Sequence, residues 1–178
     1  MSTHRCTERQ PPARADKALV QLCRFMSMQS LVLSTAESCT AGLMAARLAD
    51  VPGAGSLLDC AFVVYSPQAK QRVLRVSGDT LARCNLTSEE VAREMAQGVL
   101  HYTHANVIIA NTGVTDNTDP TIPAGTQWFA WLFRGSDGSD RLFSETRRFS
   151  GDRNQIREDA AVYALMQIPE LHARLARD

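Results

Sequence analysis

A group of hydroxyl and thiol side chains that could carry chemistry, Ser38, Cys39 and Thr40, follows the apolar run at residues 31–33. An apolar run, a short polar segment and then small and apolar residues predict a β-strand, a turn and an α-helix. In open α/β sheets such turns lie at the carboxyl ends of strands, where ligands bind. A helix that began at residues 38–41 would also direct free N–H groups at an oxyanion or a phosphate. The turn is therefore a candidate site for nucleophilic attack.

The same turn also has a purely structural interpretation. Ser38 or Thr40 could simply cap the helix, because serine and threonine are ordinary N-cap residues. Glu37 could be an acid of the first helical turn, and Cys39 could be a small buried apolar residue.

A second pair of candidate residues, Tyr65 and Lys70, comes after the apolar run at residues 60–65. A continuous apolar run predicts a strand that is buried on both faces. Ser66 and Pro67 predict the start of a helix, which places Lys70 in its first turns. An ammonium near a phenol can hold negative charge there. The structural alternative is an interfacial tyrosine and a surface lysine.

Two further candidates lie in the second half of the chain. A long polar loop at residues 112–120 follows the apolar run at 106–111, which is a natural position for a ligand contact. Arg153 opens a predicted helix at 155–166, where its charge opposes the helix dipole. An anionic ligand would explain this placement, and a surface arginine is the alternative.

The elements that must position these residues predict a single α/β domain. Its sheet is expected to be mixed, because an antiparallel hairpin follows the βα units. A disordered or loosely attached tail at 1–14 precedes the domain at 15–178. The predicted helices cover residues 16–28, the segment after the turn to about 50, the segment after 66, 77–83, 87–103, 155–166 and a short last segment. The predicted strands cover 31–35, 60–65, 106–111, 127–133 and 141–149.

Composition limits the classes of partner. The 178 residues carry 19 basic and 19 acidic side chains, so the chain has no general attraction for nucleic acid. No apolar run approaches the roughly 20 residues of a membrane span, and the first residues lack the apolar core of a secretory signal. The five scattered cysteines form no CxxC pair, which favours reduced thiols in the cytoplasm over disulfides. His101 and His104 lack a third ligand, so we expect no metal site.

Taken together, the motifs resemble those of the CinA C-terminal domain family, which includes nicotinamide-nucleotide amidohydrolases. The resemblance extends over roughly residues 16–168, and its motifs occur in the family's order. The motifs are TAESCT at 35–40, FVVYS at 62–66 with Ala69-Lys70, TGV at 112–114, PAGTQWFA at 123–130 and FSGDR at 149–153.

This resemblance implies hydrolysis of the carboxamide of nicotinamide mononucleotide to nicotinic acid mononucleotide and ammonia, in pyridine nucleotide recycling. It also implies a single three-layer α/β/α domain with a mixed, mostly parallel sheet. The expected assembly is a homo-oligomer, a dimer or higher, that acts on a small-molecule nucleotide without a cofactor. A lysine and a tyrosine beside a serine can supply a base and a proton relay. The expected catalytic residues are Ser38, Tyr65 and Lys70, together with Ser56 if a shift of one residue restores its hydroxyl to the family position. The expected substrate-binding residues are Glu37, Thr40, Gly55, Thr112, Gly113 and Arg153.

The sequence departs from the family pattern in three places. Gly55 occupies the position of a second serine, with Ser56 one place later, and Ala41 replaces a glycine. The family's glycine-rich loop has become residues 112–118, in which Asp116 brings a negative charge that would repel phosphate. These departures motivate two alternatives. One is a divergent paralogue that binds nucleotides or regulates without amidase activity, and the other is a hydrolase with a shifted substrate.

Overall fold

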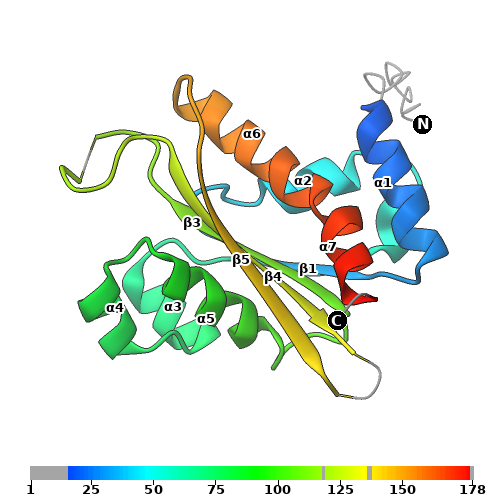
Figure 1. Cartoon of the computed structure of the whole chain (residues 1–178), viewed down its shortest axis with the longest axis horizontal. Helices are drawn as coiled ribbons and strands as arrows, with labels where there is room; N and C mark the ends of the chain where they lie inside the picture. Colours follow the sequence, from blue (N-terminus) through cyan, green and yellow to red (C-terminus); the bar gives the residue numbers. More distant parts are fainter. Residues whose placement is uncertain (1–15, 118, 136–137, 177–178) are drawn as a thin grey trace, which may run out of the picture.

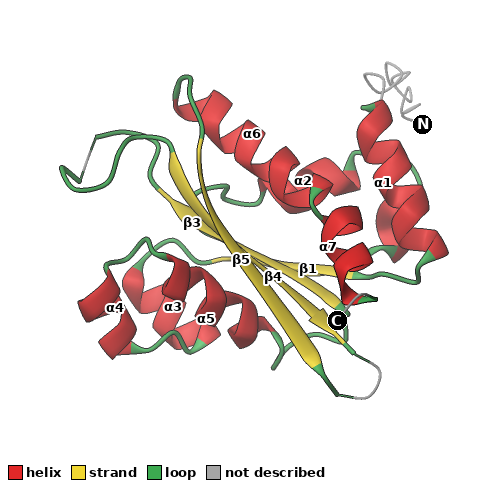
Figure 2. Ribbon diagram, in the orientation of Figure 1, coloured by secondary structure: helices red, strands yellow, loops and turns green. Residues whose placement is uncertain are grey.

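The protein is a three-layer α/β/α domain in which one sheet lies between two layers of helices (Figures 1 and 2). The structure, a computed structural model, describes residues 16–117, 119–135 and 138–176, so the predicted tail at 1–14 lies outside the described residues. The described strands are β1 (Leu33–Glu37), β2 (Leu58–Val63), β3 (Val107–Gly113), β4 (Thr126–Arg134) and β5 (Asp140–Arg148).

The sheet is mixed, as the sequence predicts, and its order is β2-β1-β3-β4-β5. Strands β2, β1 and β3 pair in parallel, so that their carboxyl ends meet at one edge of the sheet. Strands β3, β4 and β5 pair antiparallel, and β4 and β5 form the predicted hairpin. The register pairs Glu37 at the end of β1 with Asn111 in β3, which brings the turn after β1 beside the end of β3.

Each face of the sheet has its own apolar core, and successive residues of β3 contribute to both. Val107 and Ile109 pack under one layer of helices, whereas Ile108 and Ala110 pack under the other. The first layer holds α1 (Lys17–Met28), α2 (Leu43–Ala49), α6 (Arg153–Met166) and α7 (Ile168–Leu175). The second holds α3 (Pro67–Leu74), α4 (Gly78–Cys84) and α5 (Glu89–Val99).

Local sequence signals account for several helix starts. Ser66 caps α3 with Pro67 at the first helical position, and Ser88 caps α5 by accepting from the N–H of Val91. The end of α5 was predicted at about residue 103, but the helix ends at Val99.

Three predicted elements near the site are wrong in detail. The strand predicted at 31–35 occupies Leu33–Glu37, so Glu37 belongs to the strand, and the following helix starts at Leu43 rather than at 38–41. The strand predicted at 60–65 is not buried on both faces. It occupies Leu58–Val63 at the edge of the described sheet, where half-buried and exposed residues alternate. An apolar sequence does not distinguish such an edge from a central strand, and Val63 is 53% exposed.

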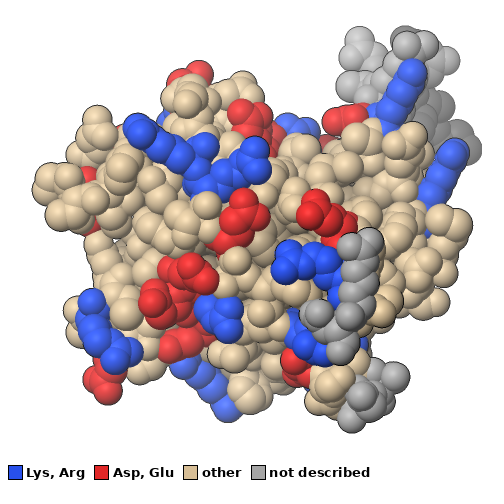
Figure 3. Space-filling view, in the orientation of Figure 1, with Lys and Arg blue, Asp and Glu red and all other residues tan. Residues whose placement is uncertain are grey.

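The surface offers no large field of one sign on the face drawn in Figure 3, where basic and acidic side chains are interspersed. Within the described part of the chain, no helix combines the length and the apolar character needed to cross a bilayer.

Candidate active site

The turn after β1 is fixed to the neighbouring strand β3 by a buried asparagine. The N–H of Ser38 donates to the Asn111 carbonyl oxygen at 3.0 Å, and the N–H of Thr40 donates to Asn111 Oδ1 at 3.2 Å. The Asn111 side-chain amide in turn donates to Gln127 Oε1 in β4 at 3.1 Å. These contacts place Ser38 at the carboxyl end of the parallel strands, where open α/β sheets bind ligands.

Lys70 reaches this turn from α3 and contacts the Ser38 hydroxyl. Its Nζ donates to Ser38 Oγ at 2.8 Å and to the Val64 carbonyl oxygen at 3.0 Å. The lysine has no exposed surface, whereas 6% of Ser38 is exposed. Burial lowers the pKa of Lys70 to about 8, because removal from water penalises the charged form. A lysine of this pKa is neutral often enough near pH 7–8 to act as a base toward the serine.

Cys39 is the neighbouring thiol, and its environment argues against a role as the nucleophile. It is buried, and burial raises the pKa of its thiol, although Gln127 Nε2 donates to its Sγ at 3.3 Å. Because the thiolate is the reactive form, a raised pKa makes Cys39 a poor nucleophile. Ser38 is therefore the candidate nucleophile of the turn.

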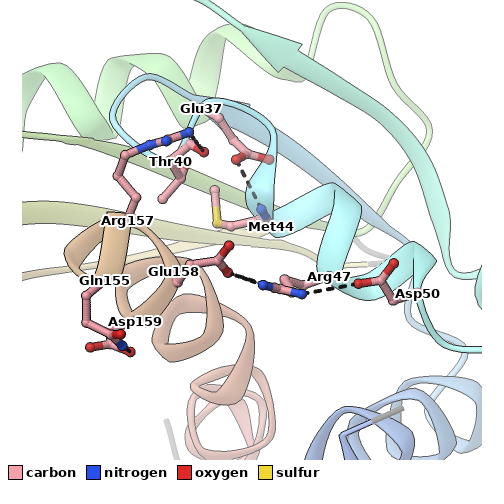
Figure 4. Close-up of polar contacts among 9 residues, drawn as sticks. All are labelled: Glu37, Thr40, Met44, Arg47, Asp50, Gln155, Arg157, Glu158 and Asp159. Atoms are coloured by element: carbon pink, nitrogen blue, oxygen red, sulfur yellow. Dashed lines mark hydrogen bonds and ion pairs between the residues drawn. The ribbon is translucent and has the colours of Figure 1, made fainter. Parts of the chain in front are cut away.

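The N-terminus of α2 does not offer its N–H groups to a ligand, because Glu37 accepts from them. The two carboxylate oxygens of this buried side chain accept from the backbone N–H groups of Gly42, Met44 and Ala45 at 2.8–3.2 Å. Thr35 donates its hydroxyl to the same carboxylate at 2.9 Å. Figure 4 shows Glu37 directed at Met44. The buried Glu37 carboxylate thus fixes the backbone between β1 and α2. The N-cap of α2 is Gly42, and not Ser38 or Thr40.

Tyr65 and Arg153 are also brought together, but on the exposed side of the site. Arg153 Nη2 donates to the Tyr65 hydroxyl at 3.1 Å, and its Nη1 donates to Thr115 Oγ1 at 2.8 Å and to Asp116 Oδ2 at 3.0 Å. Lys70 Nζ contacts the backbone carbonyl of Tyr65 at 3.3 Å. The tyrosine ring therefore extends toward the arginine, while its backbone helps to hold the lysine.

The sequence analysis missed Arg157, a residue of α6 that donates hydrogen bonds to the backbone of the turn. Its Nε donates to the Cys39 carbonyl oxygen at 3.0 Å, and its Nη2 lies 3.4 Å from that of Thr40. Figure 4 shows this side chain extending from α6 toward Thr40. Arg157 comes one helical turn after Arg153, and this spacing on one face of α6 is the signal that could have identified it.

Helix α6 is itself fixed to α2 by an ion pair, also drawn in Figure 4. Arg47 donates through Nε at 2.7 Å and through Nη2 at 2.5 Å to the same Glu158 oxygen, and its Nη1 lies 3.4 Å from Asp50. The helix that carries Arg153 and Arg157 therefore has a defined position relative to the turn.

Five other predicted site residues have different surroundings. Gly55 and Ser56 lie in the exposed 3-10 turn that precedes β2, at the amino end of the parallel strands, so this chain does not bring them to Ser38. Thr112 Oγ1 lies 3.5 Å from the Leu86 carbonyl oxygen. Gly113 is packed on Gln127, because an added Cβ would lie 2.4 Å from that side chain. Thr40 Oγ1 is buried without a hydrogen-bond partner among the described residues.

Comparison with known proteins finds relatives that match most of this chain. The family model of the CinA C-terminal domain matches residues 16–172. The nicotinamide-nucleotide amidohydrolase PncC of Enterobacter agglomerans is 42% identical over 85% of this chain and 92% of its own length. A putative competence-damage inducible protein of Symbiobacterium thermophilum is 40% identical over 82% of this chain, which spans only 35% of that longer protein.

Among solved structures, the competence damage-inducible protein A of Klebsiella pneumoniae superposes with a TM-score of 0.81 at 33% identity. The match covers 88% of this chain and 96% of that chain. Sequence and structure agree over the same region, and the chain belongs to the CinA C-terminal domain family.

Proposed function

We propose that this protein is an amidohydrolase that converts the carboxamide of a nicotinamide nucleotide to a carboxylate and ammonia. The observation that carries the proposal is the 2.8 Å contact between Ser38 Oγ and the buried Lys70 Nζ. A serine beside a lysine of lowered pKa is a nucleophile with its own base. The name of the E. agglomerans relative supports a nicotinamide nucleotide as the substrate, and we take nicotinamide mononucleotide as the reference compound.

In this mechanism, neutral Lys70 accepts the proton of Ser38 as Oγ attacks the amide carbon. The N–H of Cys39 directly follows the nucleophile in the chain and is the nearest backbone donor in sequence for the developing oxyanion. When the C–N bond breaks, the proton on Lys70 passes to the leaving nitrogen, which departs as ammonia. Water then attacks the Ser38 ester, with Lys70 again as base, and releases the carboxylate.

The test is ammonia release from nicotinamide mononucleotide by the full chain and by Ser38→Ala and Lys70→Met variants. We expect both variants to lose activity by about a thousandfold or more, as removal of a nucleophile or its base does in other hydrolases. Lys17→Met is the matched control, because Lys17 is the other lysine of the sequence and lies exposed in α1.

A Lys70→Met variant that folds normally and keeps its activity would contradict the proposal. Tight binding of nicotinamide mononucleotide without ammonia release by the unmodified protein would instead assign it a nucleotide-binding role.

A further inference from the structure

Asp116 forms an ion pair with Arg153, and this pair bears on which substrates the site prefers. We propose that Asp116 acts as an internal anion at Arg153 and so weakens the contribution of the substrate's phosphate, which lets the site use unphosphorylated nicotinamide riboside as well as nicotinamide mononucleotide. This inference rests on the proposed amidohydrolase function and concerns the role of the phosphate in substrate choice.

Arg153 has the features of an anion-binding residue. It is the first residue of α6, a 14-residue helix, where a positive side chain opposes the dipole. Its guanidinium also lies near the turn. Burial raises the pKa of the thiol of Cys39, the residue next to Ser38, and the nearby positive charge of Arg153 acts in the opposite direction to lower it. An arginine in such a position is suited to bidentate binding of a phosphate or a carboxylate.

The described structure already supplies an anion for that arginine. Asp116 Oδ2 lies 3.0 Å from Arg153 Nη1, and Thr115 Oγ1 accepts from the same nitrogen at 2.8 Å. The neighbouring Arg157 already uses Nε and Nη2 as donors to the carbonyl oxygens of Cys39 and Thr40, so these N–H groups are engaged by the turn rather than offered to a phosphate. A phosphate that approached Arg153 would therefore have to displace the carboxylate or lie beside it and be repelled.

A nicotinamide nucleoside, which lacks the phosphate, does not encounter this competition at Arg153. It carries the positive charge of the pyridinium ring, as the nucleotide does, but it has no phosphate that must compete with Asp116 for Arg153. The side chains of Arg153 and Asp116 are 54% and 52% exposed, and an ion pair this open to water is weak. We therefore expect Asp116 to reduce the preference for the phosphorylated substrate about tenfold, which corresponds to about 1.4 kcal/mol, and not to exclude phosphate completely.

Asp119 provides a matched control in the same loop. Its carboxylate accepts from the N–H and hydroxyl of Thr121 and from Asn85, and it makes no contact with Arg153 among the described residues. Asp119→Asn removes the same charge from the loop without freeing the arginine, and Asp116→Asn frees it.

The experiment compares kcat/KM for ammonia release from nicotinamide mononucleotide and from nicotinamide riboside. In Asp116→Asn we expect the ratio of the phosphorylated to the unphosphorylated substrate to rise about tenfold, with little change in Asp119→Asn. An unchanged ratio in Asp116→Asn, with activity present, would refute the role of Asp116 in substrate preference and leave the hydrolase function intact.

A binding measurement keeps the inference testable if neither compound is hydrolysed. Inorganic phosphate titrated into each protein by calorimetry should bind Asp116→Asn about tenfold more tightly than the unmodified protein or Asp119→Asn. That result without any ammonia release would refute the hydrolase function while supporting the role of Asp116. Equal phosphate affinity in all three proteins would refute the role of Asp116.

Discussion

Lys70 Nζ lies 2.8 Å from Ser38 Oγ, although the two residues are 32 positions apart and come from different elements. The lysine is wholly buried, and its other partners are the carbonyl oxygens of Val64 and Tyr65. Among the described residues no carboxylate is paired with its charge. The contact therefore combines a positioned hydroxyl with an amine that gives up its proton unusually readily.

The first prediction concerns the pH dependence of activity. If neutral Lys70 is the base, kcat/KM for ammonia release should rise with pH and level off above the pKa of Lys70, about 8. The measurement is a pH–rate profile from pH 6 to 9 at constant ionic strength. A flat profile across this range would mean that Lys70 does not need to lose a proton.

The same lysine should also couple stability to pH. Its pKa is about 8 in the folded protein against 10.5 for an ordinary lysine, so between these values the unfolded chain binds more protons. The free energy of unfolding should therefore rise with pH across this window, by about 3 kcal/mol relative to Lys70→Met. Urea titrations of both proteins at pH 7.5 and 10 measure their unfolding free energies. The difference between the two proteins isolates Lys70, because the other titrating groups contribute equally to both. A constant difference would show that the lysine is not perturbed.

Glu37→Gln should destabilise the fold. The Glu37 carboxylate accepts from the N–H groups of Gly42, Met44 and Ala45, and a glutamine would direct its own NH₂ group at some of these donors. We expect a loss of about 2–4 kcal/mol in unfolding free energy, since buried donors lose their acceptor. Chemical denaturation measures it, with exposed Glu90→Gln in α5 as a control that should cost less than about 1 kcal/mol. Equal losses in the two variants would show that the buried carboxylate is not needed.

Ala41→Gly should stabilise the protein. Ala41 has φ +50°, a left-handed conformation in which a Cβ atom is strained and a glycine is not. We expect a gain of about 1 kcal/mol, read as a higher melting temperature. Ala46→Gly in α2 is the control, because glycine within a helix should instead cost about 1 kcal/mol. A lower melting temperature for Ala41→Gly would mean that the strain is relieved elsewhere in the turn.

Features governed by local sequence were predictable. Ser66 and Pro67 start α3 and so place Lys70, and the strand pattern around residues 127–149 marks the β4–β5 hairpin. Contacts between segments that are distant in the sequence could not be predicted. Arg157 meets the carbonyl of Cys39 across 118 positions, and no local pattern encodes that distance. Likewise, the apolar sequence of β2 does not reveal that the strand lies at the edge of the described sheet.

The sequence contains two lysines, Lys17 and Lys70, while all its other basic side chains are arginine or histidine. Selective ¹⁵N labelling of lysine would therefore give a spectrum with only two side-chain amine resonances. Exposed Lys17 exchanges its protons rapidly with water, whereas the ammonium of Lys70 is shielded and held by Ser38 and Val64. Below pH 8 the surviving resonance would belong to Lys70, so the protonation of this one residue could be followed directly by NMR, without mutation, in the resting protein and during turnover.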